Sequence, residues 1–140
     1  MTRRLSILVL ALVAVAVMST AAGARTAGSA TLTIRHQRVH CHTWSLNGGP
    51  YAAAQHATLA AGSKLTITDN DVMPHRLIQL AGPSVRMQNR GAMNRPGATT
   101  TVTFAKPGVY RFRTRAGEDY MKGIVTTGED NVLTLTVTVR

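Results

Sequence analysis

Apolar and polar residues alternate along most of the chain from residue 31 onward, in short runs separated by turn residues. The clearest run is VLTLTVTVR, residues 132–140, and the same period of two recurs in residues 64–68 and 99–105. A period of two puts successive side chains on opposite faces of a strand, so one face of each strand can pack in a core. Because glycine, proline, asparagine and aspartate interrupt the runs frequently, the pattern predicts an all-β sandwich without a helix of useful length.

Other strands are expected at residues 31–39, 51–60, 76–80, 109–114 and 122–126. The alanine-rich run 51–60 is short for a stable helix, which favours a strand. His-Cys-His-Thr-Trp, residues 40–44, follows the first run without a turn residue. If this segment is extended, His42 and Trp44 share one face and Cys41 lies on the other. Residues 81–98 form the longest expected loop, and loops of this length are often functional.

The strand directions predict which of these segments meet. If successive strands run antiparallel, the turns alternate between the two ends of the sandwich. The end of the first strand, with residues 40–42, then lies at the same end as His75 and the loop 115–121. Side chains that can bind a soft metal are therefore expected to gather at one end.

The first 24 residues have the composition of a secretory signal. Two arginines precede an apolar run, and small residues follow it at 22–24. The run is too short for a membrane anchor, so we expect no membrane span in the mature chain and a secreted or periplasmic location. Residues 25–30 are expected to form a flexible leader, and residues 31–140 a single domain.

The charge balance limits the possible partners and activities. The chain has 16 basic and 6 acidic residues, but no run of basic residues with interleaved aromatic residues, so nucleic-acid binding is not expected. No complete set of catalytic residues is apparent either, and we expect the protein not to be an enzyme. The one cysteine, Cys41, has no partner for a disulfide and is either a buried apolar residue, a reactive thiol or a metal ligand.

Three segments carry a resemblance to a known family. Residues 65–80, LTITDNDVMPHRLIQL, combine a strand, a polar turn and His75, and KPGVYRF at 106–112 is followed by Met-Lys-Gly at 121–123. Together these segments resemble the cupredoxins, whose fold is an eight-stranded Greek-key β-sandwich. The likeness extends over roughly residues 51 to 127. It implies copper as the cofactor, with His75 as the first histidine ligand and Met121 as the weak axial ligand.

The chain also departs from that family. Blue-copper cupredoxins have a cysteine at the end of the strand after Tyr-x-Phe and a second histidine in the following loop. Thr114 and Gly117 stand at these places, so a standard blue-copper centre cannot form. The segment HCHTWS at 40–45, with GEDYM at 117–121, looks like a divergent group of exported bacterial cupredoxin-like proteins.

The end of the first strand is the candidate replacement for the missing ligands. Either the Cys41 thiolate completes a rearranged site with His75 and Met121, or Cys41 packs beside Trp44 and His42 or His40 joins His75 instead. Adjacent strand residues face opposite ways, so Cys41 and His42 bind one metal only if the backbone bulges. The candidate metal ligands are therefore His75, Met121, Cys41 and His42.

Two functions follow from the sequence. The first is an exported copper-binding protein with an atypical site, which handles copper or transfers electrons and passes either to a protein partner. The alternative is a metal-free module of the same fold, which uses its basic surface and the loop 81–98 to hold an acidic partner.

Overall fold

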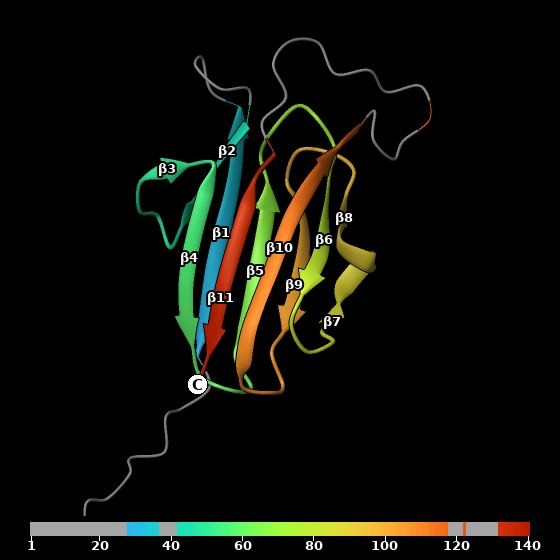
Figure 1. Ribbon diagram of the computed structural model, residues 1–140. Helices are drawn as coiled ribbons and strands as arrows, with labels where there is room; N and C mark the ends of the chain where they lie inside the picture. Colours follow the sequence, from blue (N-terminus) through green and yellow to red (C-terminus); the bar gives the residue numbers. More distant parts are fainter. Residues whose placement is uncertain (1–27, 37–41, 118–121, 123–131) are drawn as a thin grey trace, which may run out of the picture.

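The computed structural model describes residues 28–36, 42–117, 122 and 132–140, and these form two β-sheets (Figure 1). The predicted signal at 1–24 and most of the strand expected at 122–126 lie outside the described residues. The strands are β1 (Ser29–His36), β2 (His42–Leu46), β3 (Tyr51–Ala52), β4 (Ala54–Leu59), β5 (Lys64–Asp69), β6 (His75–Ala81), β7 (Arg86–Met87), β8 (Ala92–Met93), β9 (Ala98–Thr103), β10 (Gly108–Ala116) and β11 (Thr134–Val139), with one short 3-10 helix, η1 (Gln88–Gly91).

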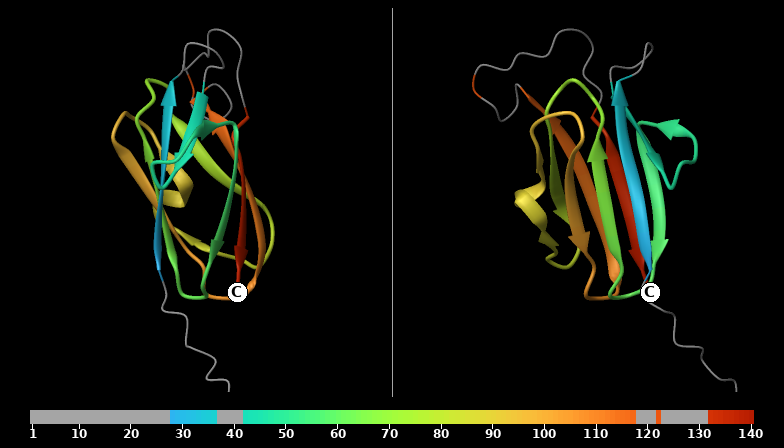
Figure 2. Two further views of the ribbon diagram at one scale, coloured as in Figure 1. Left: turned by 90° about the vertical axis from the view of Figure 1, so that its left-hand side faces the viewer. Right: turned by 180° about the vertical axis from the view of Figure 1, so that it is seen from behind.

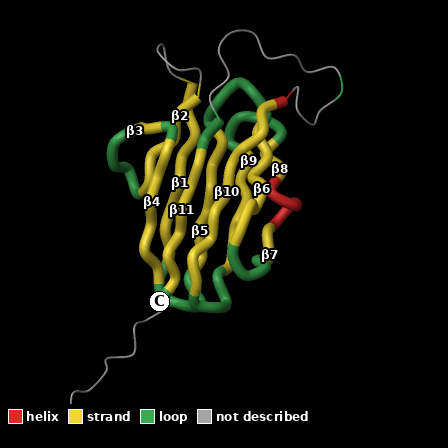
Figure 3. The backbone as a smooth tube through the Cα atoms, viewed as in Figure 1, coloured by secondary structure: helices red, strands yellow, loops and turns green. Residues whose placement is uncertain are grey.

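The two sheets pack face to face as a sandwich. The first sheet has the order β3-β2-β1-β5-β9-β7, and the second has the order β4-β11-β10-β6-β8. Figure 2 shows the two layers edge-on, and Figure 3 shows how little helix the described chain contains. Eight of the strands have five residues or more, four of them in each sheet. The predicted all-β sandwich is confirmed.

The alternating pattern produces the core. Along β5 and β11, buried residues alternate with partly or fully exposed polar residues, Lys64 and five threonines, as the period of two requires. Both sheets contribute to one apolar cluster, whose largest fully buried side chains include Trp44, Tyr110, Phe104 and Phe112. Most outward positions are polar, so each sheet buries one face only.

The prediction for residues 40–44 needs a correction. Residues 42–46 do not continue the first strand but form β2, which runs antiparallel to β1 with His36 opposite His42. The short strand β3 returns antiparallel to β2, so β4 still runs in the direction expected for the run 51–60. The loop expected at 81–98 also contains β7, β8 and η1.

The strand register places one end of both sheets around the histidines. His42 lies opposite His36, Asp69 lies opposite Ile34, and His75 lies opposite Ala116. The first of these strand pairs includes the beginning of β2, and the last includes the end of β10. The expectation that the end of the first strand, His75 and the segment after residue 114 share one end of the sandwich therefore holds for the described residues.

Gly91 has a left-handed backbone, with a φ of +76°, and lies close to β6. An added Cβ at this position would overlap with the Leu77 carbonyl oxygen. Gly97 has a similar φ of +79° but no neighbouring atom within 4 Å of the Cβ position. Gly97→Ala is expected to lower the free energy of unfolding by about 1–2 kcal/mol, the cost of a left-handed L residue. Gly91→Ala is expected to cost at least about 1 kcal/mol more, because it adds overpacking. Urea denaturation of both variants measures this difference, and equal losses would contradict it.

Candidate metal centre

Two histidines and two aspartates lie together where β2, β5 and β6 meet. His42 begins β2, His75 begins β6, Asp69 ends β5, and Asp71 lies in the turn between β5 and β6. All four side chains are buried, with at most 1% of their surface exposed. Buried ionisable residues are rare unless they are paired, so each of these side chains is expected to have a partner.

Each aspartate holds one histidine. Asp71 Oδ2 lies 2.7 Å from His42 Nδ1, and Asp69 Oδ2 lies 3.1 Å from His75 Nδ1. The two imidazole rings meet edge to face, with centroids 4.7 Å apart. Because each carboxylate accepts from Nδ1, it favours the tautomer whose lone pair is on Nε2. His75 Nε2 is buried and has no hydrogen-bond partner among the residues that the structure describes.

The turn between β5 and β6 orients both carboxylates with its own backbone. Asp69 Oδ1 accepts a hydrogen bond from the Asp71 backbone N–H at 3.0 Å, and Asp71 Oδ1 accepts one from the Met73 N–H at 3.1 Å. These are Asx-type turns, in which a side chain caps the backbone two residues on. Each aspartate thus uses one oxygen to shape the turn and the other to hold a histidine.

The charge state of Asp71 follows from these contacts. Burial by itself would raise the pKa of Asp71, but the hydrogen bonds from His42 and from the Met73 backbone, together with the electrostatic interaction with His42 and His75, lower it below its usual 3.8. Asp71 is therefore ionised at neutral pH. A buried carboxylate that stays ionised is a strong acceptor for the ring N–H of His42.

A third histidine stands at the rim of this group. His36 Nδ1 lies 3.6 Å from Asp71 Oδ1, and 53% of the His36 side chain is exposed. One ligand atom each from His36, His42 and Asp71 lies within 4.8 Å of the others, a grouping that can hold a metal ion. From the sequence, Asp69 and Asp71 were expected only as turn residues, and His36 only as a surface residue. The spacing Asp-x-Asp followed by His75 was the available signal.

Of the four predicted ligands, the structure brings two together. His42 and His75 are in ring contact, whereas Cys41 and Met121 lie outside the described residues. Thr114, at the place of the family's cysteine, is buried in β10 opposite Leu77. The described part of the site is thus built from imidazoles and carboxylates.

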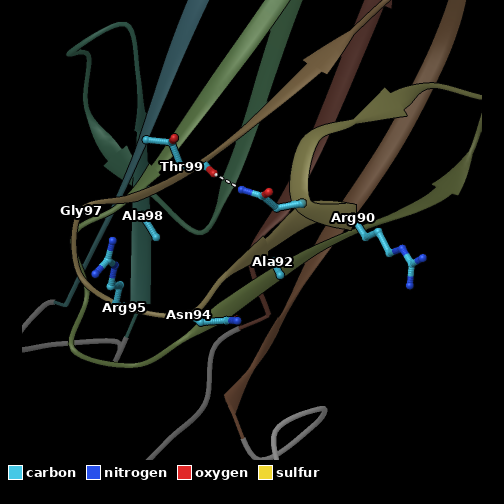
Figure 4. Close-up of a pocket in the computed structure, with 8 residues that line it drawn as sticks. Arg90, Ala92, Asn94, Arg95, Gly97, Ala98 and Thr99 are labelled. Atoms are coloured by element: carbon cyan, nitrogen blue, oxygen red, sulfur yellow. Dashed lines mark hydrogen bonds between the residues drawn. The ribbon is translucent and has the colours of Figure 1, made fainter.

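A separate polar hollow of about 750 Å³ lies beside the start of β9 (Figure 4). Asn89, Arg90, Asn94 and Arg95 contribute to its lining, and neither His42 nor His75 does. Figure 4 shows Arg90 and Arg95 extending on opposite sides of the hollow, so their guanidinium groups do not converge on one point. The two guanidinium groups therefore do not form a site that holds one anion between them.

Comparison with known proteins gives matches of fold only. No model of a protein family and no curated protein matches the sequence. Among solved structures, an oxidized amicyanin mutant is 14% identical with a TM-score of 0.38, over 77% of this chain and 80% of that one. A purple cupredoxin from Nitrosopumilus maritimus is 15% identical with a TM-score of 0.41, over 77% of this chain and 98% of that one.

An oxidized plastocyanin from Dryopteris crassirhizoma is also similar, at 13% identity and a TM-score of 0.46, over 79% of this chain and 99% of that one.

Within the described residues, no helix is long and apolar enough to cross a membrane. The eight longer strands form two four-stranded layers, as the resemblance implied. The described chain is thus a two-layered β-sandwich with the strand layout that the resemblance to cupredoxins implies.

Proposed function

We propose that this protein is an exported copper-binding protein whose centre is built on His42 and His75, and that it handles copper or transfers electrons. The observation that carries the proposal is the pair of buried, touching imidazoles, each held at Nδ1 by a buried aspartate. Imidazole suits copper, and a carboxylate on the other ring nitrogen is the usual outer partner of a metal-binding histidine. The orphaned His75 Nε2 fits a metal ligand.

Copper is favoured over other metals by the soft residues that the sequence adds. Cys41 precedes His42 directly, and Met121 follows β10, which ends at this end of the sandwich. Thiolate and thioether ligands select copper(I) over hard cations. Bound copper would supply one-electron exchange between Cu(I) and Cu(II). We propose Cys41 and Met121 as the further ligands, with His42 and His75 as the histidine pair.

The two aspartates would act on the centre through the histidines. Asp69 and Asp71 would hold the imidazoles in one tautomer and one orientation, with Nε2 available for the metal. The surrounding burial would exclude water from the ligands. Since His42 faces the core with Trp44, Cys41 could reach the same metal only if the chain leaves the extended geometry before β2.

Titration of the purified protein with Cu(I) and Cu(II), in competition with a chelator, tests this function. His75→Ala is expected to weaken copper binding by more than the roughly 10–100-fold that loss of an outer-shell partner costs. His56→Ala is the matched control, because His56 is exposed on β4 and stands opposite Thr136 of β11, on the outer face of the same sheet that contains His75. The control is expected to bind copper like the unchanged protein.

The outcomes separate the alternatives. Equal copper affinity in the unchanged protein and His75→Ala would overturn the proposed centre. A thiolate charge-transfer band that disappears in Cys41→Ser would support Cys41 as a ligand. Retained binding without such a band would support a centre of histidine and methionine.

A further inference from the structure

The outer face of β10 carries a row of arginines. Arg111, Arg113 and Arg115 occupy alternate positions, and the residues between them, Phe112 and Thr114, are buried. Alternate residues of a strand point to the same side, so the three arginines share the outward face of the second sheet. This face is turned towards the viewer in Figure 1.

The neighbouring strands add positive charge and provide no negative charge. On one side, Arg76 of β6 stands directly opposite Arg115. On the other side, Thr136 and Thr134 of β11 stand opposite Arg111 and Arg113. The residues that stand opposite the row in these strand pairs therefore carry no negative charge.

No acidic residue of the described chain compensates this row. The described part of the chain contains two acidic residues, Asp69 and Asp71, and both are buried and held by histidines. Within that part, Arg111, Arg113 and Arg115 make no ion pair, and Arg113 Nε is buried without a hydrogen-bond partner. Guanidinium groups left in this state are suited to carboxylate recognition from outside.

We propose that this arginine row binds an extended acidic segment of a partner protein, in which carboxylates alternate with other residues. Arginines two apart on a strand are about 6.6–6.8 Å apart along it, and carboxylates two apart on an extended peptide have the same spacing. Exposed apolar residues border the row on the same sheet, with Leu80 56% and Val109 49% exposed. Arginine with exposed apolar side chains is typical of protein interfaces.

The face fits a nucleic acid less well. Single-stranded nucleic acids bind through aromatic side chains on which the bases stack. Among the phenylalanine, tryptophan and tyrosine residues that the structure describes, only Tyr51 is exposed, and it lies on β3 of the other sheet. The binding of an acidic peptide would not depend on the copper centre, since none of the three arginines belongs to it.

A labelled peptide of alternating glutamate and threonine is the probe, and its binding to the metal-free protein is measured by fluorescence anisotropy at low salt. The triple variant Arg111→Thr, Arg113→Thr, Arg115→Thr is expected to bind about tenfold more weakly, because three exposed charge pairs are lost. The matched control is the triple variant Arg86→Thr, Arg90→Thr, Arg95→Thr, which removes the same charge elsewhere. Circular dichroism checks that both variants keep the β-sheet spectrum.

The two variants make the outcome decisive. Loss confined to the β10 variant supports the proposal, as does weaker binding of the matching glutamine and threonine peptide. Equal losses in both variants would mean attraction by net charge alone and would overturn it. Absence of peptide binding, or tighter binding of a single-stranded oligonucleotide of equal charge, would also overturn it.

Discussion

Asp71→Ala is expected to lower the free energy of unfolding by about 3 kcal/mol, since it removes the buried acceptor that holds His42. Asp71 Oδ2 accepts from His42 Nδ1 at 2.7 Å, and Asp71 Oδ1 accepts from the Met73 backbone N–H at 3.1 Å. The variant leaves the buried His42 Nδ1–H and the partly buried Met73 N–H without these acceptors. A domain of this size has a total stability of about 5–15 kcal/mol, so the loss is a large fraction of it. Urea denaturation at pH 7 measures it.

The same substitution is expected to reduce the acid sensitivity of the protein. The pKa of Asp71 is lowered in the folded state. At pH values near and below the ordinary pKa of 3.8, the folded protein therefore binds fewer protons than the unfolded chain. The contribution of Asp71 to stability is therefore fully present above its ordinary pKa of 3.8 and is lost as the pH falls through the lower folded value. Stability measured from pH 6 to pH 2 should fall less steeply in Asp71→Ala.

Asp71→Asn provides the matched comparison. An asparagine keeps an oxygen that can accept from the Met73 N–H, but it loses the negative charge beside His42. Its stability should lie between those of Asp71→Ala and the unchanged protein, and its copper affinity should fall by about 10–100-fold if Asp71 orients a ligand. A stability loss below about 1 kcal/mol in Asp71→Ala would show that the His42 contact is not important for folding.

The sequence predicted the sandwich because its strands have one buried face each. Residues 132–140 and 64–68 alternate almost without error, and the structure places strands there as β11 and β5. The hairpin between β1 and β2 was missed, because residues 37–41, QRVHC, contain no glycine, proline, asparagine or aspartate. Turn prediction depends on those residue types, so a reversal without them looks like a continuous strand.

Half of the described site was predictable from the directions of the strands. Strand direction alone brought the region of His42 to the same end as His75, and the ring contact bears this out. The pairing of Asp69 with His75 and of Asp71 with His42 was not predictable, since Asp-Asn-Asp between two strands is equally typical of a solvent-exposed turn. In the folded structure both carboxylates are buried, and one oxygen of each is directed to a ring.

Trp44→Ala is expected to have a still larger effect, a loss of about 3–5 kcal/mol in the free energy of unfolding. Trp44 is fully buried and stands opposite Ile34 of β1 and Ala52 of β3. Removing the indole would leave a cavity where β2 packs on the core. His42 lies two residues earlier on the same face of β2, so the variant should also weaken copper binding by loosening that histidine.

Two controls separate volume from the indole N–H and from position on the sheet. Trp44 Nε1 has no hydrogen-bond partner within the described residues, so Trp44→Phe loses ring volume but no such bond there and should cost clearly less than the alanine variant. Tyr51→Ala removes an aromatic ring from the edge strand β3, where Tyr51 is 36% exposed and lies under the Arg35 guanidinium, and should cost about 1 kcal/mol or less. Urea denaturation ranks the three variants. If Trp44→Ala cost no more than Tyr51→Ala, the core would not be what holds β2 in place, and contacts of His42 itself, such as those with Asp71 and His75, would have to position that histidine.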